Sequence, residues 1–211
     1  MVVNGWPSFP DELPGFDTAD VPDEPHELFL GWLADAGQHM LAPHAPVLST
    51  VDSGGAPDAR VVILRGVDAA GFRFSTSADS PKGGQLGAEP RAALTFFWPG
   101  RGRQVRVRGS AAPCSAEESA ADFARRSPAS RAEILVGHQS EVLADPAELT
   151  AAAEAAAERV RADPERPPPG WTRYLLAPYT VEFWQASHDR RHVRLRYRQA
   201  GEAWARERLW P

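Results

Sequence analysis

The most informative stretch of the chain is Arg60-Val61-Val62-Ile63-Leu64-Arg65-Gly66, followed shortly by Gly71-Phe72-Arg73-Phe74-Ser75-Thr76. The apolar, β-branched run predicts one strand over residues 59–67. The second segment alternates apolar and polar residues, which predicts a half-buried strand. Ala70-Gly71 supplies a turn between them. Two successive strands joined by a tight turn indicate antiparallel pairing.

Similar strand patterns recur outward from this stretch. Further strands are predicted at residues 46–51, 92–98, 104–111, 172–176, 180–185, 193–198 and 203–209. Helices are predicted at residues 26–41, 82–88 and 115–126, with a longer alanine-rich one opening at Asp145-Pro146. Many short strands interrupted by a few helices predict an α+β fold built on a closed or nearly closed antiparallel barrel. Side chains fill such a small barrel, so a large ligand is expected outside it.

Composition narrows the class of protein. The 211 residues suit one ordinary domain, with residues 1–25 as an extended arm and residues 26–211 as a single domain. A net charge of −5 disfavours a non-specific nucleic-acid binder. Cys114 is the only cysteine, so neither an internal disulfide nor a cysteine-based metal site is expected. The chain shows no membrane-length apolar run, and MVVNGWPSFPDELPGF lacks the pattern of a secretory signal, so a cytoplasmic location is expected.

Four segments carry a family resemblance. The first is the opening stretch with Ser80-Pro81-Lys82, and the second is Gly102-Arg103-Gln104-Val105-Arg106-Val107-Arg108-Gly109. The third is Gly137-His138-Gln139-Ser140. The fourth runs from Glu182-Phe183-Trp184-Gln185 through Arg190-Arg191-His192-Val193-Arg194 to Glu207-Arg208-Leu209-Trp210-Pro211. In order and spacing, over residues 26–211, they resemble the pyridoxamine 5'-phosphate oxidase family.

The resemblance implies an FMN-binding split β-barrel of about seven to eight antiparallel strands with peripheral helices. It implies a homodimer with FMN at the subunit interface. It also implies an oxidase that takes two electrons from pyridoxamine or pyridoxine 5'-phosphate and passes them through the flavin to O2, releasing H2O2. The cofactor would supply the redox chemistry, and the protein would supply position and electrostatics.

Nine residues match the family's FMN ligands by position. For the FMN phosphate they are Arg60, Lys82 and Ser140; for the rest of the cofactor they are Ser75, Thr76, Gln104, Gln139, Trp184 and Arg194. The residue types suit these roles, because an acidic protein needs local cations to hold a dianion and buried amides can both donate to and accept from the flavin ring. Lys82 is the only lysine in the chain, and it opens a predicted helix.

Five residues match the family's substrate site. Arg190 and His192 form the Arg-x-His that lies over the substrate beside the flavin, and they are the predicted catalytic pair. Arg65, Arg126 and Ser130 match the cradle of the substrate phosphate. Plainer interpretations stay open for every site residue: a solvent-facing strand arginine, a surface lysine, a loop hydroxyl or a core tryptophan.

The chain departs from the family pattern mainly on the substrate side. Asp122 stands where the family has a tyrosine, and a carboxylate a few ångströms from a phosphate costs about 1–4 kcal/mol at intermediate dielectric. Arg65 replaces a lysine, Ser127 a proline, Pro81 a basic residue and Val193 an aspartate, while residues 6–11 lack the family's N-terminal Arg and Tyr. The FMN site is therefore better kept than the substrate-phosphate site.

Four possible functions can be compared. A vitamin B6 oxidase is slightly favoured, and a diverged oxidase of the phenazine-biosynthesis type acting on another reduced ring is close behind. A flavin-binding module without turnover would not need Arg190 and His192. A nicotinamide-dependent reductase has no support, because no Gly-x-Gly-x-x-Gly follows a strand.

Overall fold

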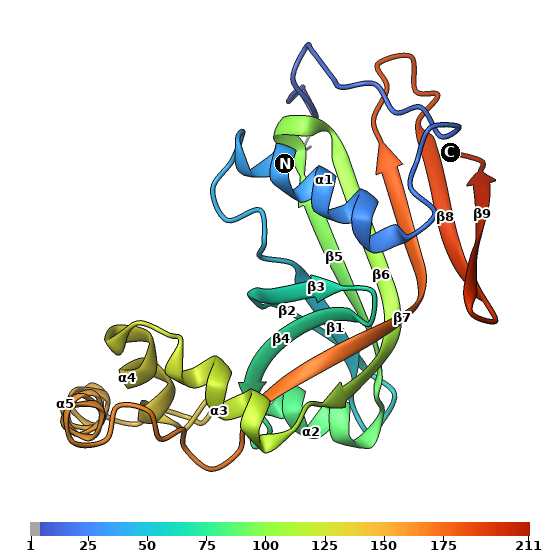
Figure 1. Cartoon of the computed structure of the whole chain (residues 1–211). Coiled ribbons are helices and arrows are strands. Elements are labelled where there is room, and N and C mark those ends of the chain that lie inside the picture. The colour runs from blue at the N-terminus through green and yellow to red at the C-terminus, as the bar shows by residue number, and fades with distance from the viewer. Residues whose placement is uncertain (1–4) are drawn as a thin grey trace.

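The structure, a computed structural model, describes residues 5–211 and contains one nine-stranded antiparallel sheet with helices around it (Figure 1). The strands are β1 (Val47–Val51), β2 (Pro57–Val61), β3 (Leu64–Asp68), β4 (Gly71–Ser77), β5 (Arg91–Trp98), β6 (Arg103–Pro113), β7 (Trp171–Gln185), β8 (Val193–Ala200) and β9 (Ala203–Leu209). The helices are α1 (Pro25–Gly37), α2 (Pro81–Ala88), α3 (Ala116–Ala124), α4 (Pro128–Val136) and α5 (Pro146–Ala162), with a 3-10 turn at Pro99–Arg101.

Strand β7 organises the sheet. The strand order is β2-β1-β5-β6-β7-β4-β3, and β8 also pairs with β7 and continues to β9. One half of β7 pairs with β4, the other half pairs with β8, and β6 runs along both. The β6–β7 register shifts at Arg108/Gly109. This irregularity changes which alternate residues face the core, from Tyr174 and Leu176 to Val181 and Phe183.

The main core is aromatic and lies within the curved sheet. Phe29 of α1 is fully buried, with ring centroids 4.9 Å from Phe72, 4.8 Å from Phe96 and 6.0 Å from Trp98. Tilted and edge-to-face aromatic contacts of this kind add to the stabilisation from burial. α1 is thereby fixed against β4 and β5.

Helices α1, α2, α3 and α5 begin within one residue of their predicted starts. Ser115 and Glu118 form the expected capping box of α3, and Asp145 caps α5 ahead of Pro146. Ser80 caps α2 by accepting a hydrogen bond from the Gly83 amide. α3, α4 and α5 gather at one end of the molecule (Figure 1), around a second apolar cluster that contains Phe123, Leu135, Ala156 and Val160.

The N-terminal segment, residues 5–24, forms no helix or strand but contacts the sheet. Phe16 and Val21 pack against the main core. The Tyr197 hydroxyl donates to the Pro22 carbonyl at 2.8 Å, and Phe9 lies 5.7 Å from Trp184 between ring centroids. Residues 1–4 of the predicted arm lie outside the described residues.

The structure differs from the sequence-based prediction in three places. Residues 59–67 form two strands, because the ladder breaks between β2 and β3, where the Val62 and Leu64 amides bond to Pro46 and His44 carbonyls. The predicted strands 172–176 and 180–185 are one strand, β7, which runs through Pro178 at its irregular register. Helix α4 was not predicted, since its start Pro128-Ala129-Ser130 lacks a long apolar period. The α+β split barrel itself is confirmed, with nine strands among residues 5–211 in place of seven or eight.

The register shift provides a stability test. At Gly109 an added Cβ would press against the Ala177 carbonyl and lie 3.0 Å from the Pro178 Cα, so Gly109→Ala should lower the free energy of unfolding by about 1–3 kcal/mol. At Gly31 in α1 nothing lies within 4 Å of an added Cβ, so Gly31→Ala should raise it by up to about 1 kcal/mol. Urea unfolding followed by tryptophan fluorescence measures both, and equal midpoints for the two variants would contradict this account.

Candidate functional site

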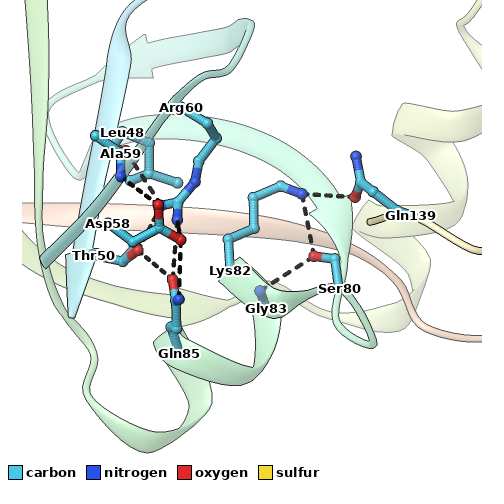
Figure 2. A network of polar contacts seen from close by, with 10 residues as sticks. All are labelled: Leu48, Thr50, Asp58, Ala59, Arg60, Ser80, Lys82, Gly83, Gln85 and Gln139. Carbon is cyan, nitrogen blue, oxygen red and sulfur yellow. Dashed lines mark hydrogen bonds and ion pairs between the residues drawn. The ribbon is translucent and has the colours of Figure 1, made fainter. Parts of the chain in front are cut away.

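A network of polar side chains joins β1, β2, α2 and the loop after α4 (Figure 2). We call Arg60, Lys82 and Gln139 the Lys82 cluster. The Lys82 ammonium donates to the Gln139 Oε1 at 2.6 Å and to the Ser80 Oγ at 3.2 Å. The structure thus brings together two predicted FMN-phosphate ligands and one predicted flavin ligand.

Lys82 is a buried cation without a buried anion beside it. Its exposed fraction is 9%, and within residues 5–211 no carboxylate reaches salt-bridge distance of it. Burial, together with the positive charge of Arg60, lowers the pKa of Lys82 to about 8. A buried charge held only by neutral acceptors is costly, so this position suits a bound anion.

Arg60 is held in a fixed orientation. Its guanidinium donates to Thr50 Oγ1 at 2.5 Å and to Gln85 Oε1 at 3.1 Å, and it pairs with Asp58 Oδ2 at 2.5 Å. Figure 2 shows the Arg60 guanidinium directed toward Asp58 and Gln85, and the Lys82 ammonium directed toward Ser80 and Gln139. Half of the Asp58 side chain is exposed, so water screens its charge and Arg60 keeps part of its attraction for an anion.

The remaining hydroxyl residues of this group lie nearby in the fold. Thr76 is buried at the end of β4, and the hydroxyl of Ser75 is buried without a hydrogen-bond partner among residues 5–211. Ser140 follows Gln139 in an exposed turn where His138, at φ 55°, and Ser140, at φ 75°, adopt left-handed backbone. Such a conformation is unfavourable for non-glycine residues and is often retained for function.

A second group of predicted residues forms a cross-strand row. Gln104 of β6 lies opposite Trp184 of β7, which lies opposite Arg194 of β8. We call these three the Trp184 row. All point away from the core, because their neighbours Val105, Phe183 and Leu195 are buried in it. Arg194 is fixed by Glu182 Oε1 at 2.7 Å and by the Trp210 carbonyl at 2.9 Å.

The predicted catalytic pair lies beside this row. The His192 ring is 4.8 Å from the Trp184 ring between centroids, and His192 Nδ1 accepts a hydrogen bond from the Ser187 amide at 3.0 Å. Because Nδ1 accepts, the neutral imidazole carries its proton on Nε2. Arg190 is exposed in the same loop at φ 62°, a left-handed conformation that a non-glycine residue rarely adopts.

The Lys82 cluster and the Trp184 row lie on different faces of the sheet. Ser75, beside the cluster, lies opposite Arg173, and Trp184 follows eleven residues later along β7. Arg60 lies opposite the core residue Leu48, so it points to the inner face, whereas Trp184 points outward. Within one subunit the two groups therefore face different sides of the sheet.

A third group surrounds a buried carboxylate. Asp122 of α3 is 2% exposed and pairs with Arg65 Nε at 3.3 Å and Arg126 Nη2 at 2.9 Å. We call these residues the Asp122 triad. Burial acts to raise the pKa of the Asp122 carboxyl, but hydrogen bonding and charge from Arg126, with the charge of Arg65, outweigh it, and the pKa lies below its ordinary value. Ser130 lies in the first turn of the adjacent helix α4.

Comparison with known proteins identifies the family. Residues 36–165 match the family model described as pyridoxamine 5'-phosphate oxidase, and residues 171–211 match the pyridoxine 5'-phosphate oxidase C-terminal dimerisation region. The chain belongs to the pyridoxamine 5'-phosphate oxidase family. A pyridoxine/pyridoxamine 5'-phosphate oxidase of Pseudomonas paraeruginosa is 42% identical over 208 residues, which cover 93% of each chain. The family binds FMN, and its named oxidases make this chain an oxidoreductase by relationship.

Solved structures agree with this placement. PhzG from Burkholderia lata, in complex with tetrahydrophenazine-1-carboxylic acid, superposes with a TM-score of 0.88 at 33% identity, covering 94% of this chain and 99% of that one. A pyridoxamine 5'-phosphate oxidase-related, FMN-binding protein of Nostoc punctiforme superposes with a TM-score of 0.76 at 20% identity, which supports the fold alone. No described helix is both long and apolar enough to cross a membrane.

Sequence reasoning missed several residues that hold these groups in place. Gln85 bonds to Arg60, Thr50 and Asp58, yet nothing in the short helix pattern distinguishes it. Glu182 is 6% exposed between Arg106 and Arg194, although its position on the alternating strand predicts a solvated side chain. Phe9 contacts Trp184 from an arm that shows no period. Only pairing between distant segments could reveal these roles.

Lys82 offers a direct titration test, because it is the only lysine. In protein labelled at lysine, the single side-chain NMR signal should titrate near pH 8, whereas exposed lysines titrate near 10.4. Arg60→Gln removes the neighbouring positive charge and should raise that pKa. It should stay below 10.4, since burial persists. A Lys82 signal that titrates at 10 or above in the unliganded wild type would contradict the buried, unpaired charge.

Proposed function

We propose that this chain is an FMN-dependent oxidase that transfers two electrons from a reduced ring substrate through the flavin to O2, releasing H2O2. One observation carries the proposal: the buried ammonium of Lys82 lies beside Arg60 and has only neutral acceptors. A phosphate monoester carries close to two negative charges at pH 7 and would satisfy both cations. Bound FMN would supply the redox chemistry that side chains lack.

The protein's own residues would orient the reactants. Lys82, Arg60 and Ser140 would hold the cofactor phosphate, and Ser75 and Thr76 would donate to the cofactor from β4. Gln104, Gln139 and Trp184 would contact the flavin ring, and Arg194, fixed by Glu182, would present a positive charge beside it. The positive charge would stabilise the electron-rich reduced ring.

The catalytic roles fall to the loop before β8. His192 has its proton on Nε2 in the neutral state, so it can donate a hydrogen bond to a substrate oxygen or nitrogen. Arg190 is exposed in the same loop, and its left-handed backbone conformation sets the direction in which its side chain leaves the loop. Together they would orient the reacting carbon over the flavin and exclude unproductive poses.

A homodimer would unite the two groups of FMN ligands. The Lys82 cluster and the Trp184 row lie on different faces of the sheet, so each site would take one group from each subunit. Trp184 and Arg194 of this row belong to the segment that matches the family's dimerisation region. The outer face of β1, β2 and β5 also exposes Val61, Val47 and Phe97, of which Phe97 lies opposite Gln104.

Two substrate classes have support. The curated relatives at 42% identity are named for pyridoxine and pyridoxamine 5'-phosphate, so a vitamin B6 phosphate is the first candidate. PhzG from Burkholderia lata was solved with tetrahydrophenazine-1-carboxylic acid, a reduced ring without phosphate, and its high TM-score supports a diverged oxidase as the second. The Asp122 triad favours the second class, because its internal carboxylate competes with a substrate phosphate for the two arginines.

Cofactor binding is the first test of this function. Purified protein should be yellow, with about one FMN per subunit. Arg60→Ala with Lys82→Ala should weaken FMN binding far more than tenfold, because each charged hydrogen bond to phosphate contributes about 1.5–3 kcal/mol. Arg91→Ala, which removes an exposed arginine paired with Glu89 just after α2, is the matched control and should leave affinity unchanged.

The same preparation tests turnover. A reduced ring substrate should bleach the flavin anaerobically, and air should restore the colour with one H2O2 per turnover. Arg190→Ala should slow the bleaching without releasing FMN. Colourless protein that cannot be loaded with FMN would exclude the flavoenzyme, and FMN that no reduced ring compound bleaches would exclude the oxidase.

Subunit complementation tests the shared site. One variant carries Arg60→Ala with Lys82→Ala, and the other carries Trp184→Ala with Arg194→Ala. Neither should retain FMN alone. Heterodimers purified through two different tags should regain about half of the wild-type FMN, because one of their two sites then combines two intact groups. No recovery in a stable heterodimer would place each site within one subunit.

A further inference from the structure

Asp122 occupies the space between the two arginines that family position assigns to the substrate phosphate. Arg65 comes from β3 and Arg126 from the end of α3, so only the folded chain brings them together. Arg126 places Nε at 3.2 Å and Nη2 at 2.9 Å from one oxygen of Asp122, and Arg65 Nε lies 3.3 Å from the other. Both carboxylate oxygens are therefore used.

The carboxylate is fixed in place. The neighbouring residue Phe123 is fully buried in the second apolar cluster, and the capping box at Ser115 holds the start of α3. Arg126 also stacks on Trp171, with its guanidinium carbon 4.7 Å from the ring centroid. Asp122 cannot turn out to solvent without losing these contacts. Its paired arginines favour the ionised form of the carboxyl.

Charge balance then limits what the triad can bind. Two guanidinium groups and one carboxylate leave a net charge of +1. A phosphate monoester would bring nearly two negative charges against a buried carboxylate that competes for the same donors. Arg65 keeps part of its donor capacity: its side chain is 31% exposed, and its two Nη atoms have no hydrogen-bond partner among residues 5–211. A planar monoanion would match both the free donors and the charge.

We propose that Asp122 is a specificity-determining residue that acts as a built-in counter-ion, so that the enzyme takes a reduced ring substrate bearing a carboxylate and rejects a phosphorylated one. The inference rests on the proposed function, because it concerns the substrate end of the same flavin site. Lys82 provides the contrast within one chain: its ammonium has no carboxylate partner, and the Asp58 carboxylate that pairs with the neighbouring Arg60 is half exposed, so an external phosphate would meet less competition there.

The test measures ligand binding to FMN-loaded protein through the change in flavin absorbance. The probes are benzoate, a ring monocarboxylate, and phenyl phosphate, the corresponding phosphate ester. Wild-type protein should bind benzoate at least tenfold more tightly than phenyl phosphate. Asp122→Asn keeps the side-chain size and removes the charge, so it should tighten phenyl phosphate at least tenfold without tightening benzoate equally.

Asp68→Asn is the matched control. Asp68 lies on the same strand as Arg65 but outside the triad, and its carboxylate pairs with Arg73. This substitution should leave both affinities unchanged. The proposal is overturned if wild-type protein binds phenyl phosphate as tightly as benzoate, or if Asp122→Asn changes the two probes equally. If Asp122→Asn does not fold, the wild-type comparison alone decides. Protein without FMN would instead contradict the proposed function.

Discussion

The pairing of β7 with three other strands is the constraint on which this molecule depends. A single strand of fifteen residues joins β4 and β3 at one end to β8 and β9 at the other, with β6 along its length. The register shift at Gly109 lets both halves of β7 bury their alternate side chains in one core. The Lys82 cluster and the Trp184 row lie on different faces of this sheet, which favours the proposed site between two subunits.

Buried cations in this chain have two different kinds of partner, a carboxylate at one site and neutral hydrogen-bond acceptors at the other. At the Asp122 triad an internal carboxylate neutralises one of two arginines, so a net charge of +1 remains. At Lys82 the surrounding acceptors are neutral, and the cost of burial appears as a pKa of about 8. The difference matters for function, because an anion binds where its charge is still needed.

Much of the architecture could be predicted from local pattern. The alternation in Gln104–Arg108 marked β6, and Ser115 with Glu118 marked the start of α3. The errors arose where backbone partners lie far away in sequence. Val62 and Leu64 interrupt an apolar run because their amides bond to the segment before β1, and Pro178 is tolerated in β7 because the register shifts there.

By itself, the sequence determined the strand and helix periods, the helix caps and the family, because these depend on neighbouring residues and on the order of motifs. It also supplied every residue of the proposed site. Only the tertiary structure decided how those residues combine. Asp122 was expected beside Arg65 and Arg126, but only the fold pairs its carboxylate with both arginines. Charge pairing and burial depend on distances between segments far apart in the chain, and those distances exist only once β7 has joined the sheet.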